Sequence, residues 1–398
     1  MRTMRMMSRR STLSALLVVA LAGGAGAWLS AHGGAQPMAL STPPVPRIGD
    51  GRKGPERMAW IPAQRFLMGT DSRLSQRNER PAHAVQVSGF WMDVHDVTNA
   101  EFARFVAATG YVTTAEQVPR WDDLKGQLPP GTPAPAPGAL VPGAMVFVGT
   151  DTRVPLFDAS RWWRYVPGAN WRHPQGPGSD LAGKEDHPVV QVSYDDARAY
   201  ADWVGKRLPT EAEWEVAARG GLTQADYVWG GSKSPDGKAM ANIWNDDMQP
   251  FPVAGATKIE VGTRPVGSYA PNGYGLYDMA GNVWQWVADW YRADYFAQQA
   301  GQAKRGERVI DPQGPAQSFD PDDGATPADA PKRVTRGGSF LCTDTYCSGY
   351  RTSARRGTDP SNPMSHIGFR LVMTQDQWAA RTTAESVSAN VPGSGSSL

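Results

Sequence analysis

Apolar residues recur about every 3.6 positions in three segments, 98–110, 193–205 and 210–220. Each segment begins with Thr or Ser and ends with Gly, which are the residues typical of helix starts and stops. In the first and third segments a Glu follows three residues after the Thr, which completes a capping box. The pattern therefore predicts three amphipathic helices.

Strand patterns surround these helices. Residues 58–70 alternate between apolar and polar side chains and end at a Gly turn, and 84–98 resembles two further short strands. The stretch PPGTPAPAPGALVPG (129–143) is expected to be an exposed loop rather than a site for proline-binding partners. After Gly220 we expect short strands and turns without regular helices. One globular unit over 56–373 explains this organisation better than two domains.

The N-terminus has the pattern of an export segment. MRTMRMMSRR carries four Arg residues, and an apolar run with a small-residue cleavage pattern follows. Residues 1–35 are therefore a signal peptide or an uncleaved signal anchor, 36–55 a linker, and 374–398 a flexible tail. Arg9 and Arg10 leave both the general and the twin-arginine routes open. We expect an exported protein, periplasmic or secreted, and elsewhere no segment nears the roughly 20 apolar residues of a membrane span.

Composition narrows the function. The net charge is +1 without a basic stripe, so nothing indicates nucleic acid binding. The chain has 43 Gly, 33 Pro and 15 Trp residues, which predicts long ordered loops held by specific contacts, because a buried Trp needs a partner for its ring N–H.

Only two cysteines are present, in RGGSFLCTDTYCSGYR (336–351). A small structural disulfide and a chemical site are both possible. The spacing alone favours a disulfide, although its entropic gain over so short a loop is small.

Several segments help to decide between a structural disulfide and a chemical site. They are MAWIPAQRFLMG, FVAATGYVTTAEQ, GANWRHPQGPGS, RLPTEAEWEVAARGG, NGYGLYDMAGNVWQWVADW, GGSFLCTDTYC and SHIGFRLV. In this order, from Met58 to Met373, they resemble the formylglycine-generating enzyme family, also called sulfatase-modifying factors. The resemblance implies a single compact α+β domain with little regular secondary structure, related to C-type lectin-like folds. It also implies oxidation by O₂ of a cysteine within C-x-P-x-R of a client sulfatase to Cα-formylglycine.

The resemblance implies that Cys342 and Cys347 hold Cu(I), for which thiolates are suitable soft ligands, with the client cysteine as a third sulfur ligand. A reversible disulfide in the metal-free protein is compatible with this role. The other implied site residues are Ser339, Trp284, Tyr346 and His366 beside the thiols, and Trp171 and Arg172 along a client groove. For each of them a purely structural role is the alternative. His366 stands where the family usually has Asn, and it could donate a hydrogen bond, act as a base or bind metal.

Two Ca²⁺ sites are also implied, built from oxygen ligands. One would use Asp278, the carbonyls of Gly281 and Val283, and Gln285, where the family usually has Glu. The other begins at Asn242 and Ile243, with Glu260 as the nearest acidic residue.

Three other functions remain as alternatives. A non-catalytic binding module of the same fold is expected to lack the cysteine pair. An iron-dependent sulfoxide synthase needs a clustered His set, and a thiol–disulfide oxidoreductase needs C-x-x-C in a βαβ unit. Neither pattern is present. We expect a monomer, and the sequence does not identify the client.

Overall fold

The computed structural model describes residues 45–254 and 261–389. The predicted export segment (1–35) and Glu260 lie outside the described residues. Within those ranges, no helix is both long and apolar enough to cross a membrane.

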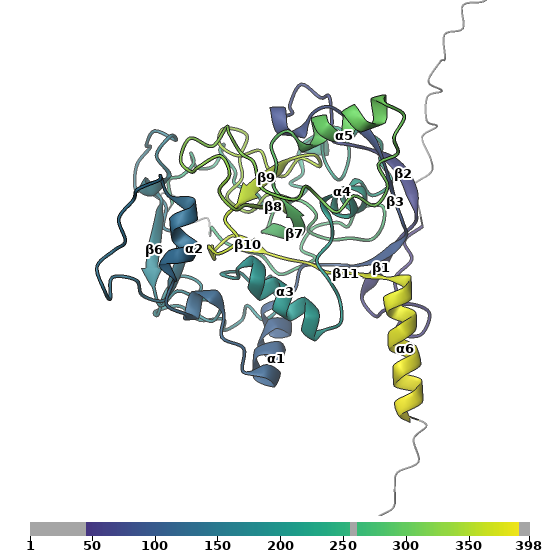
Figure 1. Ribbon diagram of the computed structural model, residues 1–398, viewed down its shortest axis with the longest axis horizontal. Coiled ribbons are helices and arrows are strands. Elements are labelled where there is room, and N and C mark those ends of the chain that lie inside the picture. Colours follow the sequence, from purple (N-terminus) through teal and green to yellow (C-terminus); the bar gives the residue numbers. More distant parts are fainter. Residues whose placement is uncertain (1–44, 255–260, 390–398) are drawn as a thin grey trace, which may run out of the picture. The chain divides into compact units, whose positions relative to one another are not determined.

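Short strands and helices alternate along the chain, joined by long loops (Figure 1). The strands are β1 (Met58–Ile61), β2 (Gln64–Met68), β3 (His83–Val87), β4 (Phe90–Asp93), β5 (Gly143–Phe147), β6 (Trp163–Pro167), β7 (Trp284–Trp290), β8 (Arg333–Arg336), β9 (Arg355–Thr358), β10 (Ile367–Gly368) and β11 (Val372–Thr374). The α-helices are α1 (Asn99–Thr109), α2 (Trp121–Leu124), α3 (Tyr194–Trp203), α4 (Glu211–Arg219), α5 (Tyr295–Lys304) and α6 (Gln375–Ala389). The predicted α+β class with little regular secondary structure is confirmed.

The strands form several small sheets. One has the order β1-β4-β11, a second has the order β10-β7-β8-β9, and β2–β3 and β5–β6 form antiparallel pairs. In the second sheet, Gln285 of β7 lies opposite Arg336 of β8, and Trp284 lies opposite Ile367 of β10. This sheet therefore brings the GNVWQW, RGGSF and SHIGF segments together.

The three predicted helices are confirmed with their caps. Thr98 and Thr210 each accept a hydrogen bond from the amide of the Glu three residues later, which completes the box by accepting from the Thr amide. Ser193 forms the same box with Asp196 before α3. A cap of this kind contributes about 1 kcal/mol, which explains why local sequence was sufficient to locate these helices.

Three α-helices were not predicted, namely α2, which has four residues, and the longer α5 and α6. We expected no regular helix after Gly220, yet α5 forms there, and α6 occupies the segment predicted to be a flexible tail. The start of α6 is capped by Thr374, which accepts from the Gln377 amide at 3.1 Å while Gln377 accepts from the Thr374 amide at 2.8 Å. Trp91 Nε1 also donates to Gln375 Oε1 at 3.0 Å, which ties the first turn of α6 to β4.

Aromatic side chains fill the core. Phe102 of α1 stacks on Tyr200 of α3 at 5.8 Å between ring centroids and meets Trp171 edge-on at 5.2 Å, and the two helices lie side by side (Figure 1). The expectation that buried ring N–H groups find partners holds only in part. Trp214 donates to Gln285 and Trp286 to the Val192 carbonyl, whereas the ring N–H groups of Trp162 and Trp171 have no partner among the described residues. Full burial of each such side chain contributes roughly 1.5–3 kcal/mol or more.

A buried ion network fixes the approach to the cysteine segment. Arg336, fully buried at the end of β8, donates to Glu211 at 2.9 Å and to Glu215 at 2.7 Å, both on α4. Arg355 of β9 makes two 2.6 Å bonds to Glu211. Both strands that flank the cysteine segment are thus attached to α4.

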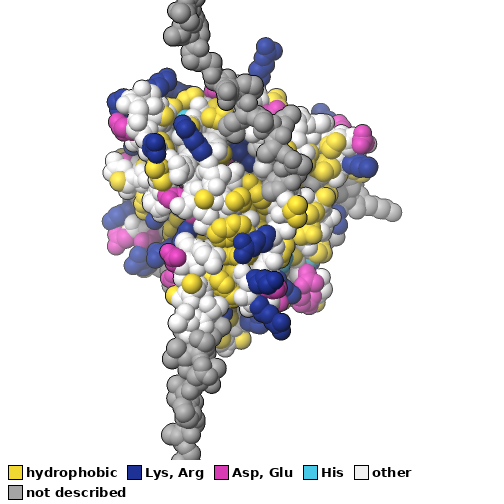
Figure 2. Space-filling model, turned by 90° about the vertical axis from the view of Figure 1, so that its right-hand side faces the viewer, with side chains coloured by type: hydrophobic (Ala, Val, Ile, Leu, Met, Phe, Trp, Pro, Cys, Tyr) yellow, Lys and Arg dark blue, Asp and Glu magenta, His cyan; other side chains and the backbone are white. Residues whose placement is uncertain are grey.

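The face of the molecule near β2, β3 and α6 is mixed in character. Figure 2 shows hydrophobic side chains across its middle, with Lys and Arg side chains scattered among them and a few acidic ones. On this face the described residues form no continuous basic stripe, in agreement with the nearly neutral net charge.

Candidate active site

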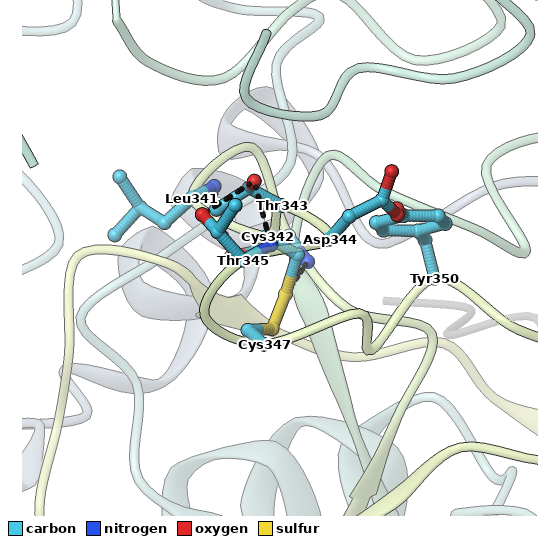
Figure 3. The surroundings of a disulfide bond; sticks show 8 residues. Leu341, Cys342, Thr343, Asp344, Thr345, Cys347 and Tyr350 are labelled. Atoms are coloured by element: carbon cyan, nitrogen blue, oxygen red, sulfur yellow. Dashed lines mark hydrogen bonds between the residues drawn. A yellow bond between two sulfur atoms is a disulfide. The ribbon is translucent and has the colours of Figure 1, made fainter. Parts of the chain in front are cut away.

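Cys342 and Cys347 lie on the loop between β8 and β9 and are joined by a disulfide, with their Cα atoms 5.0 Å apart (Figure 3). The structure therefore contains the disulfide that the spacing of the two cysteines favours. Cys342 is buried, with 1% of its surface exposed, whereas Cys347 is partly exposed. Reduction of this bond would release two adjacent thiols, one on a buried residue and one on a partly exposed residue.

The turn before Cys342 brings backbone groups to its sulfur. Gly337 and Gly338 adopt positive φ angles of 91° and 71°, which favour glycine. The Ser339 amide then donates to Cys342 Sγ at 3.4 Å, and the Cys342 amide donates to the Ser339 carbonyl at 2.9 Å. The fully buried Ser339 hydroxyl accepts from the Leu341 amide at 3.2 Å. Ser339 thus shapes this turn directly.

Trp284 packs over the cysteine segment. A Cβ atom added to Gly349 would lie 2.5 Å from the Trp284 ring and 3.2 Å from Cys342 Sγ. The ring and the sulfur therefore meet across a backbone that only glycine allows to approach so closely. Trp284 is buried, and it closes the inner side of the site.

The predicted residues Tyr346 and His366 lie in different environments, Tyr346 on the cysteine loop itself and His366 directly before β10. Tyr346 is 40% exposed and stacks on Phe251 with 4.7 Å between ring centroids. His366 is buried beside Trp163, its ring centroid 4.8 Å away, and its Nδ1 has no hydrogen-bond partner among the described residues. Burial, followed by the positive charge of Arg356, lowers the pKa of His366 well below its usual range. The His366 side chain is therefore a neutral imidazole.

The predicted groove residues do not both face solvent. Trp171 is only 3% exposed and packs in the core, so it cannot line an open groove, and this expectation is corrected. Its neighbour Arg172 lies partly exposed over the Trp171 ring at 4.3 Å and pairs with Glu116 at 2.7 Å.

One cavity near the cysteine segment was missed by the sequence reasoning. It has a volume of about 200 Å³ and lies between the 174–181 segment and residues next to the thiol loop. Among its lining side chains are Pro174, Leu181, Phe147, Phe340 and Ser365. The GANWRHP segment is the one signal in the sequence that points to this region.

The predicted calcium ligands around 278–285 do not fit a calcium ion. Gln285 Oε1 accepts from Trp214 Nε1 at 2.7 Å and from Arg370 Nε at 2.9 Å, so both of its lone pairs are in use. Its Nε2 donates to the Asp278 carbonyl at 2.8 Å. The Asp278 carboxylate accepts from the Gly267 amide at 2.7 Å. We therefore correct the expectation that Gln285 joins Asp278 and the Gly281 and Val283 carbonyls as a ligand.

The other predicted calcium site is only partly described. Asn242 donates through Nδ2 to the Gly262 carbonyl at 2.9 Å, and its own carbonyl accepts from Asn282 at 2.8 Å. Ile243 follows it, and Glu260 lies outside the described residues. Within residues 45–254 and 261–389, no group of three or more His, Cys, Asp or Glu side chains is placed to hold a metal. These residues therefore hold no His cluster of the kind that an iron enzyme needs.

Comparison with known proteins shows the family to which the chain belongs. Residues 48–375 match the family model of the sulfatase-modifying factor enzyme 1-like domain. The chain is 43% identical to the formylglycine-generating enzyme of Thermomonospora curvata over 80% of this chain and 95% of that protein. It is 46% identical to that of Mycobacterium tuberculosis over 78% and 96%. It is also 34% identical to inactive C-alpha-formylglycine-generating enzyme 2 of Mus musculus over 82% and 88%. The chain belongs to the sulfatase-modifying factor family, which confirms the resemblance found in the sequence.

Proposed function

We propose that this chain uses molecular oxygen to oxidise a cysteine within a C-x-P-x-R motif of a client sulfatase to Cα-formylglycine. The observation that carries the proposal is the adjacent cysteine pair, with Cys342 buried and Cys347 partly exposed, in a member of this family. The reduced pair suits a soft ion, and bound Cu(I) would supply the one-electron chemistry that O₂ requires.

The reaction balances with an external thiol reductant. Conversion of the client CH₂SH group to an aldehyde with release of H₂S takes two electrons from the client. Reduction of O₂ to water takes four electrons, so two more electrons and two protons come from outside the client. The complete reaction then yields one aldehyde, one H₂S and one water for each O₂ consumed.

The chain's own residues prepare the site for a thiolate. The Ser339 amide N–H points at Cys342 Sγ, and a donor in this position stabilises negative charge on sulfur. The buried Trp284 ring excludes water from the inner side of the pair. The neutral His366 adds no positive charge, so its ring would contribute packing and would not act as an acid.

The cavity between the 174–181 segment and Phe340 is the proposed place for part of the client peptide. Its lining combines apolar side chains with Asp180 and Lys184. Arg172 remains a proposed contact at the edge of the client surface, since its side chain is 44% exposed.

The proposal also includes a calcium site and the location of the protein. Ca²⁺ is proposed for the site that begins at Asn242 and Ile243 and includes Glu260, and none is proposed at 278–285. The protein would act outside the cytoplasm, in the periplasm or as a secreted monomer, on a client exported by the same cell.

A non-catalytic binding module is the second candidate, because one relative is named as inactive. The presence of both cysteines favours the enzyme.

The test incubates purified protein, Cu(I), O₂ and a thiol reductant with a peptide that contains C-x-P-x-R. Mass spectrometry is expected to show conversion of cysteine to aldehyde, and C342S and C347S are expected to abolish it. No conversion of several client peptides by protein that demonstrably binds copper would overturn the proposal.

A further inference from the structure

We propose that Asp246 is a positioning residue for the two thiols. Its carboxylate holds the Cys342–Cys347 loop in one conformation, whether or not the disulfide is formed. The inference rests on the proposed function, since it concerns how the reduced pair stays ready to bind a soft ion.

Two hydroxyl groups of the cysteine loop converge on one carboxylate oxygen. Thr343 Oγ1 donates to Asp246 Oδ2, and Thr345 Oγ1 donates to the same oxygen at 3.0 Å. Thr343 is only 1% exposed and Asp246 is partly buried, so water has limited access to this bond. Hydrogen bonds to an ionised acceptor are about twice as strong as neutral ones.

Thr343 passes this restraint on to the second cysteine. Its backbone carbonyl accepts from the Cys347 amide at 3.0 Å and from the Ser348 amide at 2.8 Å. The Thr343 and Thr345 side chains lie on the same side of the loop (Figure 3). Fixing the Thr343 side chain therefore fixes the peptide unit that orients Cys347.

The segment that carries Asp246 is itself attached to the first cysteine. The Trp244 amide donates to the Cys342 carbonyl at 3.0 Å, and the Phe251 amide donates to Asp246 Oδ1 at 3.3 Å. Asp246 thus links two parts of the cysteine loop to a segment 97 residues away in sequence. None of these bonds involves sulfur, so reduction of the disulfide leaves all of them available.

A weaker anchor lies on the opposite side of the loop. Lys233 Nζ contacts Asp344 Oδ2 at 2.5 Å, and Tyr350 donates to the other oxygen (Figure 3). Asp344 is 58% exposed, and exposed ion pairs contribute little. Asp246 is therefore the principal restraint.

The consequence is a high effective concentration of each thiol near the other. In a free loop, reduction would let the sulfurs separate, and both disulfide formation and metal binding would pay for bringing them back together. A loop held by Asp246 avoids this entropy cost.

The experiment measures the dithiol–disulfide equilibrium of the full chain in glutathione buffers. These are the only two cysteines, so thiol labelling followed by mass spectrometry reports on them alone. D246A is expected to lower the equilibrium constant for disulfide formation about tenfold, which corresponds to about 30 mV. D246N keeps a side-chain oxygen that can accept from both threonines but loses the charge, so it is expected to lose less than D246A, about threefold. D247N is the matched control, because the neighbouring Asp247 is exposed.

Copper gives a second measurement. Competition with a coloured Cu(I) chelator is expected to show a parallel loss of affinity, about tenfold, in D246A but not in D247N. An equilibrium constant for D246A equal to that of D247N would overturn the proposal, and so would a loss in D246N as large as in D246A. Where D246A does not fold, T345V removes one donor from an exposed position, and an unchanged constant in T345V would have the same meaning. The disulfide equilibrium needs neither client nor copper, so its outcome is independent of whether peptides are converted.

Discussion

Arg370 Nε donates to Gln285 Oε1 at 2.9 Å, beside the segment that family resemblance had assigned to a calcium ion. Trp214 Nε1 donates to the same oxygen at 2.7 Å. The guanidinium of Arg370 is fully buried and also lies 3.3 Å from Asp96. The positively charged side chain of Arg370 therefore lies next to the position where the family resemblance implies a calcium ion.

The substitution Q285A tests whether Gln285 binds Arg370 and Trp214 and not a calcium ion. Loss of the shared acceptor leaves two buried donors unpaired, so we expect a loss of about 1–3 kcal/mol in the free energy of unfolding. This loss, measured relative to the wild type, should be the same in buffer with calcium as in buffer with a calcium chelator. Thermal or urea unfolding under both conditions measures it.

N242A serves as the companion variant, because calcium is proposed at Asn242. The chelator is expected to destabilise the wild type and Q285A equally, and to have little effect on N242A. A loss in Q285A that is seen only with calcium present would show that Gln285 ligates the ion.

Gly349 provides a test of the packing around the thiols. A Cβ in G349A would come within 2.5 Å of the Trp284 ring and 3.2 Å of Cys342 Sγ, so the ring or the sulfur must move. Such overpacking typically costs about 1–3 kcal/mol, and displacement of the sulfur should also reduce peptide conversion severalfold. Unfolding experiments and the conversion assay measure the two effects. G178A is the control, since no atom lies within 4 Å of the Cβ it adds, and equal behaviour of the two variants would contradict this packing.

The parts of the fold that the sequence predicted correctly depend on neighbouring residues. The boxes at Thr98, Ser193 and Thr210 are complete within four residues, so pattern alone locates α1, α3 and α4. The same box at Thr374 and Gln377 was present but was hidden by the Ser- and Ala-rich composition of the tail. For α5, no side-chain cap exists at Asp294, and a local signal was missing.

The family motifs in the sequence predicted only part of the candidate site. Cys342 and Cys347 do come together, and Trp284 does lie against them. The Arg370–Gln285 bond joins residues 85 positions apart, and the carboxylate of Asp246 meets Thr343 across 97 positions. Contacts at such separations depend on tertiary packing, which neither spacing nor periodicity reveals.

The buried ion network offers a stability test. R336M removes the cation that lies between Glu211 and Glu215, and it leaves buried negative charge with less compensation. Breaking a buried pair from one side costs about 3–5 kcal/mol, because the remaining charge is desolvated without its partner. Urea unfolding is the measurement. R198M is the control, since Arg198 is 56% exposed and lies 3.9 Å from Asp195, and its loss should stay below about 1 kcal/mol. A loss in R336M no larger than this would show that the network contributes little.

The pH dependence of stability provides the last prediction, through Asp289. Its side chain is 2% exposed, and it accepts from the Glu211 amide at 2.8 Å. Burial, and then the negative charge of Glu211, raise the pKa of Asp289 to about 8. In the unfolded chain the pKa of an aspartate is about 3.9. Between these two values the folded state holds one proton more than the unfolded state, so this group makes stability fall as pH rises.

The substitution D289N removes the titrating group and keeps a side-chain oxygen that can accept the same bond. Between about pH 5 and pH 7 the free energy of unfolding of D289N, relative to the wild type, is therefore expected to rise by up to about 1.4 kcal/mol per pH unit, and to level off above about pH 8. Urea unfolding at several pH values gives the difference, from which other titrating groups cancel. D195N is the control, because Asp195 is 80% exposed and its curve should run parallel to that of the wild type. A D289N curve that is also parallel to the wild type would mean that Asp289 is ionised in the folded protein at neutral pH.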